Sequence, residues 1–122
     1  MMKKKIKIKM QKEITEKSKL LDEEGKLVQK GWAKDLKMTY NRENIAASWL
    51  RIKEWDYYAV INSDFGITFT VADLGYIGLL SIVWLDFQEE IFITEEEIVL
   101  LPRGNFYLPS SSREGNVKKK KK

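Results

Sequence analysis

The chain of 122 residues carries 22 Lys and Arg against 18 Asp and Glu, a formal net charge of +4, and it contains no Cys and no His. These absences exclude disulfide frameworks, thiolate zinc sites and every nucleophilic mechanism that relies on a cysteine or an imidazole base. With 43% hydrophobic residues, the length suits one globular domain that folds without metal or disulfide support.

The positive charge lies at the two ends of the chain. Residues 1–12 hold six Lys and no acidic residue, and residues 118–122 are five more Lys, which leaves a net charge of −7 on residues 13–117. We divide the chain accordingly into a basic N-terminal segment that forms an edge strand (1–12), a partial β domain (13–117) and a Lys tail (118–122). Such short Lys blocks are more typical of solvated tails and edge-strand guards than of phosphate-binding sites.

The longest apolar run, residues 76–85, has ten residues and includes Gly78 and Ser81, so it is well short of the roughly 18 to 20 residues of a membrane-spanning helix. It is typical of a buried strand. The N-terminal segment alternates Ile and Met with Lys and therefore lacks the continuous apolar core of a secretory signal. We expect a cytoplasmic protein without a membrane span.

The first half of the chain contains a few local signals. Residues 5–10 alternate apolar side chains with Lys, which predicts a short edge strand. The sequence Asp-Glu-Glu-Gly that ends at Gly25 predicts a turn with the glycine at positive φ.

Residues 44–54 are open to two interpretations. Apolar residues spaced by four and three positions indicate a short helix capped by Asn41 or Asn44. Alternatively, Trp49 and Ile52 lead directly into the next strand.

From Trp55 onward the chain alternates in the manner of half-buried strands. Several strands joined by tight turns predict a mainly β fold with the topology of an antiparallel meander. We expect the strands at residues 55–61, 65–72, 79–85 and, separated by the acidic turn 95–97, at 91–93 and 98–101.

The segment 79–85 is apolar on both faces except at Ser81, which indicates a central strand covered on both sides. Gly75 and Gly78 are interpreted as turn glycines, because they lack the motif of a phosphate-binding loop. The outer strands of an open meander leave backbone groups unpaired, so we expect the isolated chain to be marginally stable or to self-associate through its strand edges.

Two carboxylates are candidates for acid–base chemistry. Asp56 and Asp73 lie in or at the ends of aromatic-rich strands, where burial raises the pKa of a carboxyl group. We favour the alternative that they bond to turn backbone or to an Arg. The acidic run 95–97 is interpreted as a solvated turn rather than a cation site, since adjacent positions of a strand point to opposite faces. We expect no metal and no cofactor.

Aromatic residues are the candidates for ligand binding. In a curved sheet or barrel, such residues can line a concave apolar pocket for a small hydrophobic ligand. For the individual residues, however, we favour plain packing in the hydrophobic core. The candidates are Trp55, Tyr57, Phe69, Tyr76 and Trp84, with Trp49 beside them.

The chain also contains several short stretches whose exact residue order is distinctive enough to compare with known families. The most specific is Val71–Gly78, which reads Val-Ala-Asp-Leu-Gly-Tyr-Ile-Gly; the others are residues 13–16, 20–27, 31–32, 55–60, 65–70 and 100–104. Over most of residues 11–116 the chain resembles the N-terminal portion of the bacterial domain-of-unknown-function family 2804. The resemblance implies a largely β protein without an assigned activity, related to lipocalin-like barrels and to the tocopherol cyclase group. Because members of that family are longer, it also implies a truncated member.

The sequence therefore predicts a fragment of a larger barrel-like or curved-sheet domain that binds a small hydrophobic ligand or is structural. The alternative is an enzyme that uses Asp56 or Asp73 in an apolar cavity, and we rank it lower. A weak binder of single-stranded nucleic acid comes third, because the −7 charge of residues 13–117 opposes it.

Overall fold

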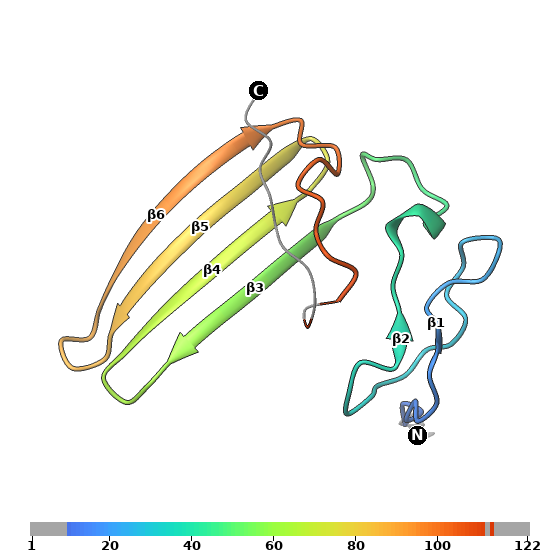
Figure 1. The fold of residues 1–122 in the computed structure, drawn as a ribbon, viewed down its shortest axis with the longest axis horizontal. Helices are drawn as coiled ribbons and strands as arrows, with labels where there is room; N and C mark the ends of the chain where they lie inside the picture. The colour runs from blue at the N-terminus through green and yellow to red at the C-terminus, as the bar shows by residue number, and fades with distance from the viewer. Residues whose placement is uncertain (1–9, 112, 114–122) are drawn as a thin grey trace, which may run out of the picture. The chain divides into compact units, whose positions relative to one another are not determined.

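The structure is a computed structural model that describes residues 10–111 and residue 113. The chain divides into two compact units, Met1–Ala46 and Ala47–Lys122, each with its own β structure (Figure 1). Neither the amino-acid composition nor the hydrophobic periodicity of the sequence indicated a boundary between Ala46 and Ala47. The strand expected at 5–10 lies outside the described residues except for Met10, which is in no strand, and the Lys tail lies outside them as well.

Short pieces of β structure hold the first unit together. β1 (Ser18–Lys19) pairs in parallel with β2 (Met38–Thr39). Ile14 is the buried hydrophobic side chain among the described residues of this unit. Two isolated bridges complete the pairing, Glu13 with Trp32 and Leu21 with Leu27.

The turn predicted at Gly25 is confirmed. Gly25 has a φ of +74°, and its backbone N–H donates to the carbonyl of Asp22 at 3.1 Å. A Cβ at this position would lie 2.5 Å from the Cβ of Ala46, so both the backbone conformation and the close approach require glycine.

The helix predicted over residues 44–54 is wrong, and the alternative is correct. The structure has a 3-10 turn, η1 (Arg42–Asn44), with Asn41 as its N-cap: the Asn41 Oδ1 accepts the Glu43 N–H at 3.0 Å. A separate turn follows at residues 48–51, where the Arg51 N–H donates to the Ser48 carbonyl at 2.9 Å. β3 begins at Glu54, shortly after Ile52. The apolar positions at 45, 49 and 52 were insufficient for a helix because two spacings define less than two turns.

The second unit contains a four-stranded antiparallel sheet in the order β3-β4-β5-β6, as Figure 1 shows. The predicted meander is confirmed. Its strands are β3 (Glu54–Ile61), β4 (Phe65–Asp73), β5 (Ile77–Asp86) and β6 (Ile91–Leu100). Among the described residues the sheet is open, because β3 and β6 each pair with one neighbour.

β6 is continuous, so the interruption predicted at residues 95–97 is wrong. These three glutamates pair with Ile82, Ser81 and Leu80 of β5 within a regular register. An edge strand accommodates them because solvent reaches carboxylates on both of its faces. The predicted alternation of the three side chains between the faces is confirmed.

The strand register assigns every side chain of the sheet to one of two faces, since directly paired residues share a face. We name the faces after one residue of each. The Phe69 face consists of residues 54, 56, 58 and 60 of β3, residues 65, 67, 69, 71 and 73 of β4, the even-numbered residues 78–86 of β5 and the odd-numbered residues 91–99 of β6. The Tyr57 face carries the alternate residues of the same strands.

β5 is central, as predicted, but it is not covered on both faces. On the Phe69 face, the side chains of Ile82 and Trp84 are 46% and 38% exposed. The central position of β5 therefore arises from pairing alone and not from packing on both sides.

One end of the sheet is nevertheless well packed, at the turn between β4 and β5. Phe106, only 3% exposed, lies over Gly78, where a Cβ would come within 2.8 Å of the Phe106 ring. Gly78 is thus part of β5 and not a turn residue, which corrects the prediction. It is glycine because the ring of Phe106 occupies the space of a side chain.

Gly75 is the turn residue at this end, as predicted, with a φ of +83°. The segment after β6 closes on the turn: the Leu101 N–H donates to the Tyr76 carbonyl at 3.0 Å, and the Arg103 N–H donates to the Gly75 carbonyl at 3.1 Å. We call this region, built from residues 73–78 and 101–107, the covered end of the sheet.

Candidate functional site

Asp73 is buried in the covered end, with 1% of its surface exposed. Its Oδ1 accepts the Gly75 N–H at 2.9 Å, and its Oδ2 accepts the Gly104 N–H at 2.6 Å. Both carboxylate oxygens are thus engaged by backbone N–H groups of two segments that are far apart in the sequence. This geometry joins the β4–β5 turn to the segment after β6, in line with the structural interpretation of Asp73.

Asp56 lies on the same face of the sheet, in β3, two positions away from the row that contains Asp73. The hydroxyl of Tyr58 donates to Asp56 Oδ2 at 3.2 Å. Partial burial of the Tyr58 ring raises the pKa of its phenol, and the Asp56 charge and this hydrogen bond raise it further. Neither Asp56 nor Asp73 is among the residues that line the hollows described below.

The five aromatic candidates do not converge on one pocket. Trp55 and Tyr57 lie on the Tyr57 face, whereas Phe69 and Trp84 lie on the Phe69 face. Tyr76 belongs to the β4–β5 turn, where the Lys53 ammonium lies 4.3 Å from the ring centre. A residue's face depends on its parity within the strand, and the candidates have mixed parity, so the register separates Phe69 and Trp84 from Trp55 and Tyr57.

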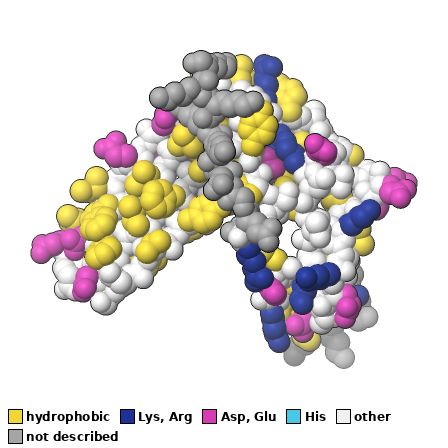
Figure 2. All heavy atoms as spheres, in the orientation of Figure 1, with side chains coloured by type: hydrophobic (Ala, Val, Ile, Leu, Met, Phe, Trp, Pro, Cys, Tyr) yellow, Lys and Arg dark blue, Asp and Glu magenta, His cyan; other side chains and the backbone are white. Residues whose placement is uncertain are grey.

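Phe69 and Trp84 belong to an exposed apolar surface. The Phe65 and Trp84 rings stack with their centres 4.9 Å apart, and Ile67, the direct partner of Trp84, lies on the same face. Figure 2 shows hydrophobic side chains gathered over the end of the sheet where the β3–β4 and β5–β6 turns lie. Exposed apolar patches of this kind mark interaction or ligand-binding surfaces.

A hollow of about 400 Å³ lies on this surface, a volume within the range of small-molecule sites. Four apolar residues of the Phe69 face form its floor: Phe69, Val71, Leu80 and Ile82. Glu95, Glu96 and Glu97 border it on the β6 side, and Thr70 and Ser81 complete its lining. We call this hollow the sheet groove. Of the aromatic candidates, Phe69 lines it.

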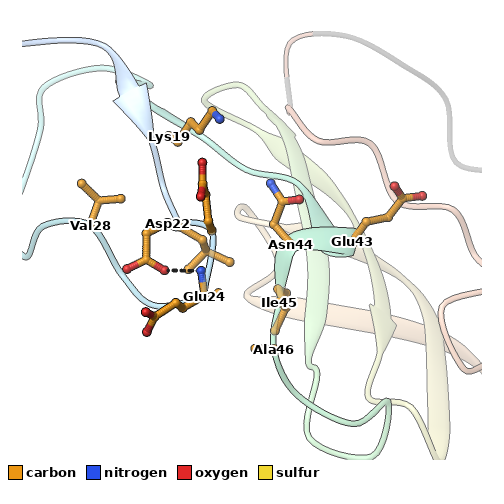
Figure 3. A pocket seen from close by; sticks show the side chains of 11 residues that line it. Lys19, Asp22, Glu24, Val28, Glu43, Asn44, Ile45 and Ala46 are labelled. Carbon is orange, nitrogen blue, oxygen red and sulfur yellow. Dashed lines mark hydrogen bonds between the residues drawn. The ribbon is translucent and has the colours of Figure 1, made fainter.

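A second hollow, of about 710 Å³, lies in the first unit. Figure 3 shows Asp22, Glu24 and Val28 on one wall and Asn44, Ile45 and Ala46 on the other. The sequence analysis missed it, since its walls come from a turn and a 3-10 segment with no recognisable motif.

The carboxylates of this second hollow have local structural roles. Asp22 Oδ1 accepts the backbone N–H groups of Glu24 and Lys26 at 2.9 and 2.8 Å, and Lys26 forms an ion pair with Glu24. The residues that the structure describes contain no group of three or more acidic side chains arranged to hold a metal ion. The hollow therefore resembles a solvated polar depression around a turn more than a built ligand site.

None of the helices in the described part of the chain has the length and apolar character needed to traverse a bilayer.

These features define a mainly β protein with an open antiparallel sheet and an exposed apolar groove on one face. The chain belongs to the family described as Domain of unknown function (DUF2804), whose model matches residues 11–122. The family resemblance inferred from Val71–Gly78 and the neighbouring stretches is thus confirmed. Comparison with the curated proteins and with the solved structures finds no match.

Proposed function

We propose that the four-stranded sheet binds a small hydrophobic ligand in the sheet groove. The observation that carries this proposal is the coincidence of a hollow of about 400 Å³ with an apolar floor on the exposed Phe69 face. Burial of apolar area contributes about 25 cal/mol per Å². A ligand that covers the exposed side chains of Phe69 and Ile82 therefore gains free energy from area that water now contacts.

A ligand-binding role is favoured over an enzymatic one by the positions of the carboxylates. Both oxygens of Asp73 are held by backbone N–H groups, and Asp56 lies outside the lining of the groove. A general acid or base has to reach its substrate within hydrogen-bond distance. The described residues also supply no observation in favour of nucleic-acid binding.

Closure of the sheet into a lipocalin-like barrel belongs to this proposal. β3 and β6 each offer an unpaired edge within the described residues, and further strands on these edges would curve the sheet around the groove. Self-association through the same edges and a cytoplasmic location remain predictions from the sequence.

The experiment is a titration of the full chain with a neutral apolar dye, N-phenyl-1-naphthylamine, followed by dye fluorescence. We expect saturable binding that Phe69→Ala weakens several-fold, since Phe69 lines the groove. Phe92→Ala is the matched control, since it removes the same side chain from the Tyr57 face, where Phe92 is 71% exposed. Circular dichroism establishes that both variants keep the sheet.

Binding that never saturates would contradict a defined site. Equal weakening by the two Phe substitutions would contradict the assignment to the Phe69 face.

A further inference from the structure

The charge of the sheet is one-sided. The strands β3–β6 contain seven acidic residues, at positions 54, 56, 73, 86, 95, 96 and 97, and no Lys or Arg. Six of the seven lie on the Phe69 face, and Glu96 alone belongs to the Tyr57 face. The apolar floor of the sheet groove is therefore surrounded by negative charge.

The acidic residues occupy both sides of the apolar floor. Across the four strands, one row reads Asp56, Val71, Leu80, Glu97, and the adjacent row reads Tyr58, Phe69, Ile82, Glu95. Each row thus has apolar residues on the two central strands and a carboxylate at one edge strand or at both. This arrangement repels an anionic amphiphile and attracts a positive group at the edge of the groove.

Aromatic rings accompany these carboxylates. Tyr58 and Phe69 are direct cross-strand partners on this face, and both rings are partly exposed, at 37% each. Ring faces attract ammonium groups, and aromatic residues beside carboxylates are the usual surroundings of alkylated ammonium ligands. The groove therefore combines an apolar floor, ring faces and negative edges.

We infer that the ligand of the sheet groove is a cationic amphiphile, with an aliphatic body on the floor and an ammonium group at the acidic edge. This inference rests on the proposed function and specifies its ligand class. The ammonium group stays in contact with water at an edge strand, so it avoids the cost of burying a charge. Its attraction to an exposed carboxylate is correspondingly modest, about two- to fivefold in affinity for each pair.

The test compares three probes with the same ten-carbon chain: decyltrimethylammonium, decanol and decanoate. The two ionic probes are kept below their micelle concentrations and the alcohol below its solubility limit. Isothermal titration calorimetry of the full chain measures the three affinities at low and at moderate salt. We expect the cation to bind several-fold more tightly than the neutral alcohol and the anion most weakly. Added salt reduces these differences because it screens exposed charges.

Two Glu→Gln substitutions, each of which removes one negative charge, locate the carboxylate that produces the preference for the cation. Glu95→Gln removes a carboxylate at the groove, and we expect it to lower the preference for the cation over the alcohol about two- to fivefold. Glu89→Gln is the control that removes the same charge outside the groove: Glu89 lies in the β5–β6 turn and is not among the residues that line the hollow. We expect this control to leave the preference nearly unchanged.

The outcomes separate the two proposals. Equal affinity for cation and alcohol, a preference for decanoate, or an equal effect of both Glu substitutions overturns the inference while the proposed function stands. Failure of all three probes to bind overturns both. Dimerisation in sedimentation velocity that Ile82→Lys abolishes also overturns both, because a second copy then occupies the face.

Discussion

The two ends of the four-stranded sheet differ in how their apolar side chains are covered. At the covered end, Phe106 and Pro102 are buried against Gly78, and Asp73 joins two distant segments. At the opposite end, which we call the open end, Phe92 of β6 is 71% exposed, and a backbone hydrogen bond from Phe87 to Asp64 links the β3–β4 and β5–β6 turns. Stability is therefore concentrated at the covered end, whereas apolar side chains stay exposed toward the open end.

The open end is held by local polar contacts. The Asn62 side chain accepts the Asp64 and Phe65 N–H groups, each at 2.8 Å, and the Phe87 N–H donates to the Asp64 carbonyl at 2.9 Å. Such hydrogen bonds at exposed turns contribute little net free energy, because water offers the same groups comparable partners. The comparison of the two ends predicts that matched substitutions have unequal effects.

Phe106→Ala has the largest expected effect. It removes a nearly fully buried ring and leaves a cavity over Gly78, at a cost of about 3 to 5 kcal/mol in the free energy of unfolding. Phe92→Ala, at the open end, is the matched control and is expected to cost less than about 1 kcal/mol. Urea unfolding followed by circular dichroism measures both. Equal costs would show that the open end is covered as well.

Asp73→Ala comes next. It leaves the N–H groups of Gly75 and Gly104 without their carboxylate partner, and unsatisfied buried donors cost about 1 to 3 kcal/mol each. Asp56→Ala removes only the acceptor of the Tyr58 hydroxyl and is expected to cost less than about 1 kcal/mol. The same urea titration distinguishes them. If Asp56→Ala proves the more damaging of the two, the structural role assigned to Asp73 is wrong.

A pair of glycines sharpens the comparison. Gly75→Ala places a side chain at positive φ and against the backbone of Trp49, with an expected cost of about 1 to 3 kcal/mol. Gly66→Ala, toward the open end, meets only side-chain atoms of Ile61, Leu85 and Phe87 at 3.3 to 3.4 Å. These side-chain ends can shift, and alanine reduces the entropy lost on folding, so the stability should change by less than about 1 kcal/mol. Midpoints of thermal unfolding test the difference.

The smallest expected effect concerns Tyr58. Its raised pKa means that the folded state favours the neutral phenol, so this contribution to stability is complete below pH 10 and is lost as the pH rises through the folded pKa. Asp56→Asn removes the negative charge and should lower the pKa of Tyr58. The difference in tyrosinate absorbance between Asp56→Asn and the double variant Asp56→Asn with Tyr58→Phe isolates this group. An unchanged Tyr58 titration would exclude Asp56 as a cause of the shift.

The sheet was predictable because its signals are local. The alternation in Phe65–Ala72 identified β4, and Asp22–Gly25 identified a turn, since turn residues and period-two patterns act within a few positions. The acidic run in β6 was misread as a break. Glutamate is disfavoured in β-strands, but the pairing of these three residues with β5 outweighs that local preference against a strand.

The site was less predictable than the sheet. The sequence marked Phe69 and Trp84 as ligand-binding candidates, and they do share a face, yet Trp55 and Tyr57 were grouped with them although they lie on the other side. The acidic edges of the groove went unrecognised because Asp56 and Glu95 are 39 positions apart and belong to opposite edges of the sheet. Only the register of all four strands places them around one floor.

By itself, the sequence determined the strands from Trp55 onward, the positive-φ turns at Gly25 and Gly75, and membership in the family, because each depends on the identity and order of neighbouring residues. The tertiary structure decided the burial of Gly78 under Phe106, the bonding of Asp73 to Gly104 and the acidic surroundings of the Phe69 face. These features depend on which distant segments meet. That outcome is set by the summed free energy of packing and pairing across the sheet, which no local pattern encodes.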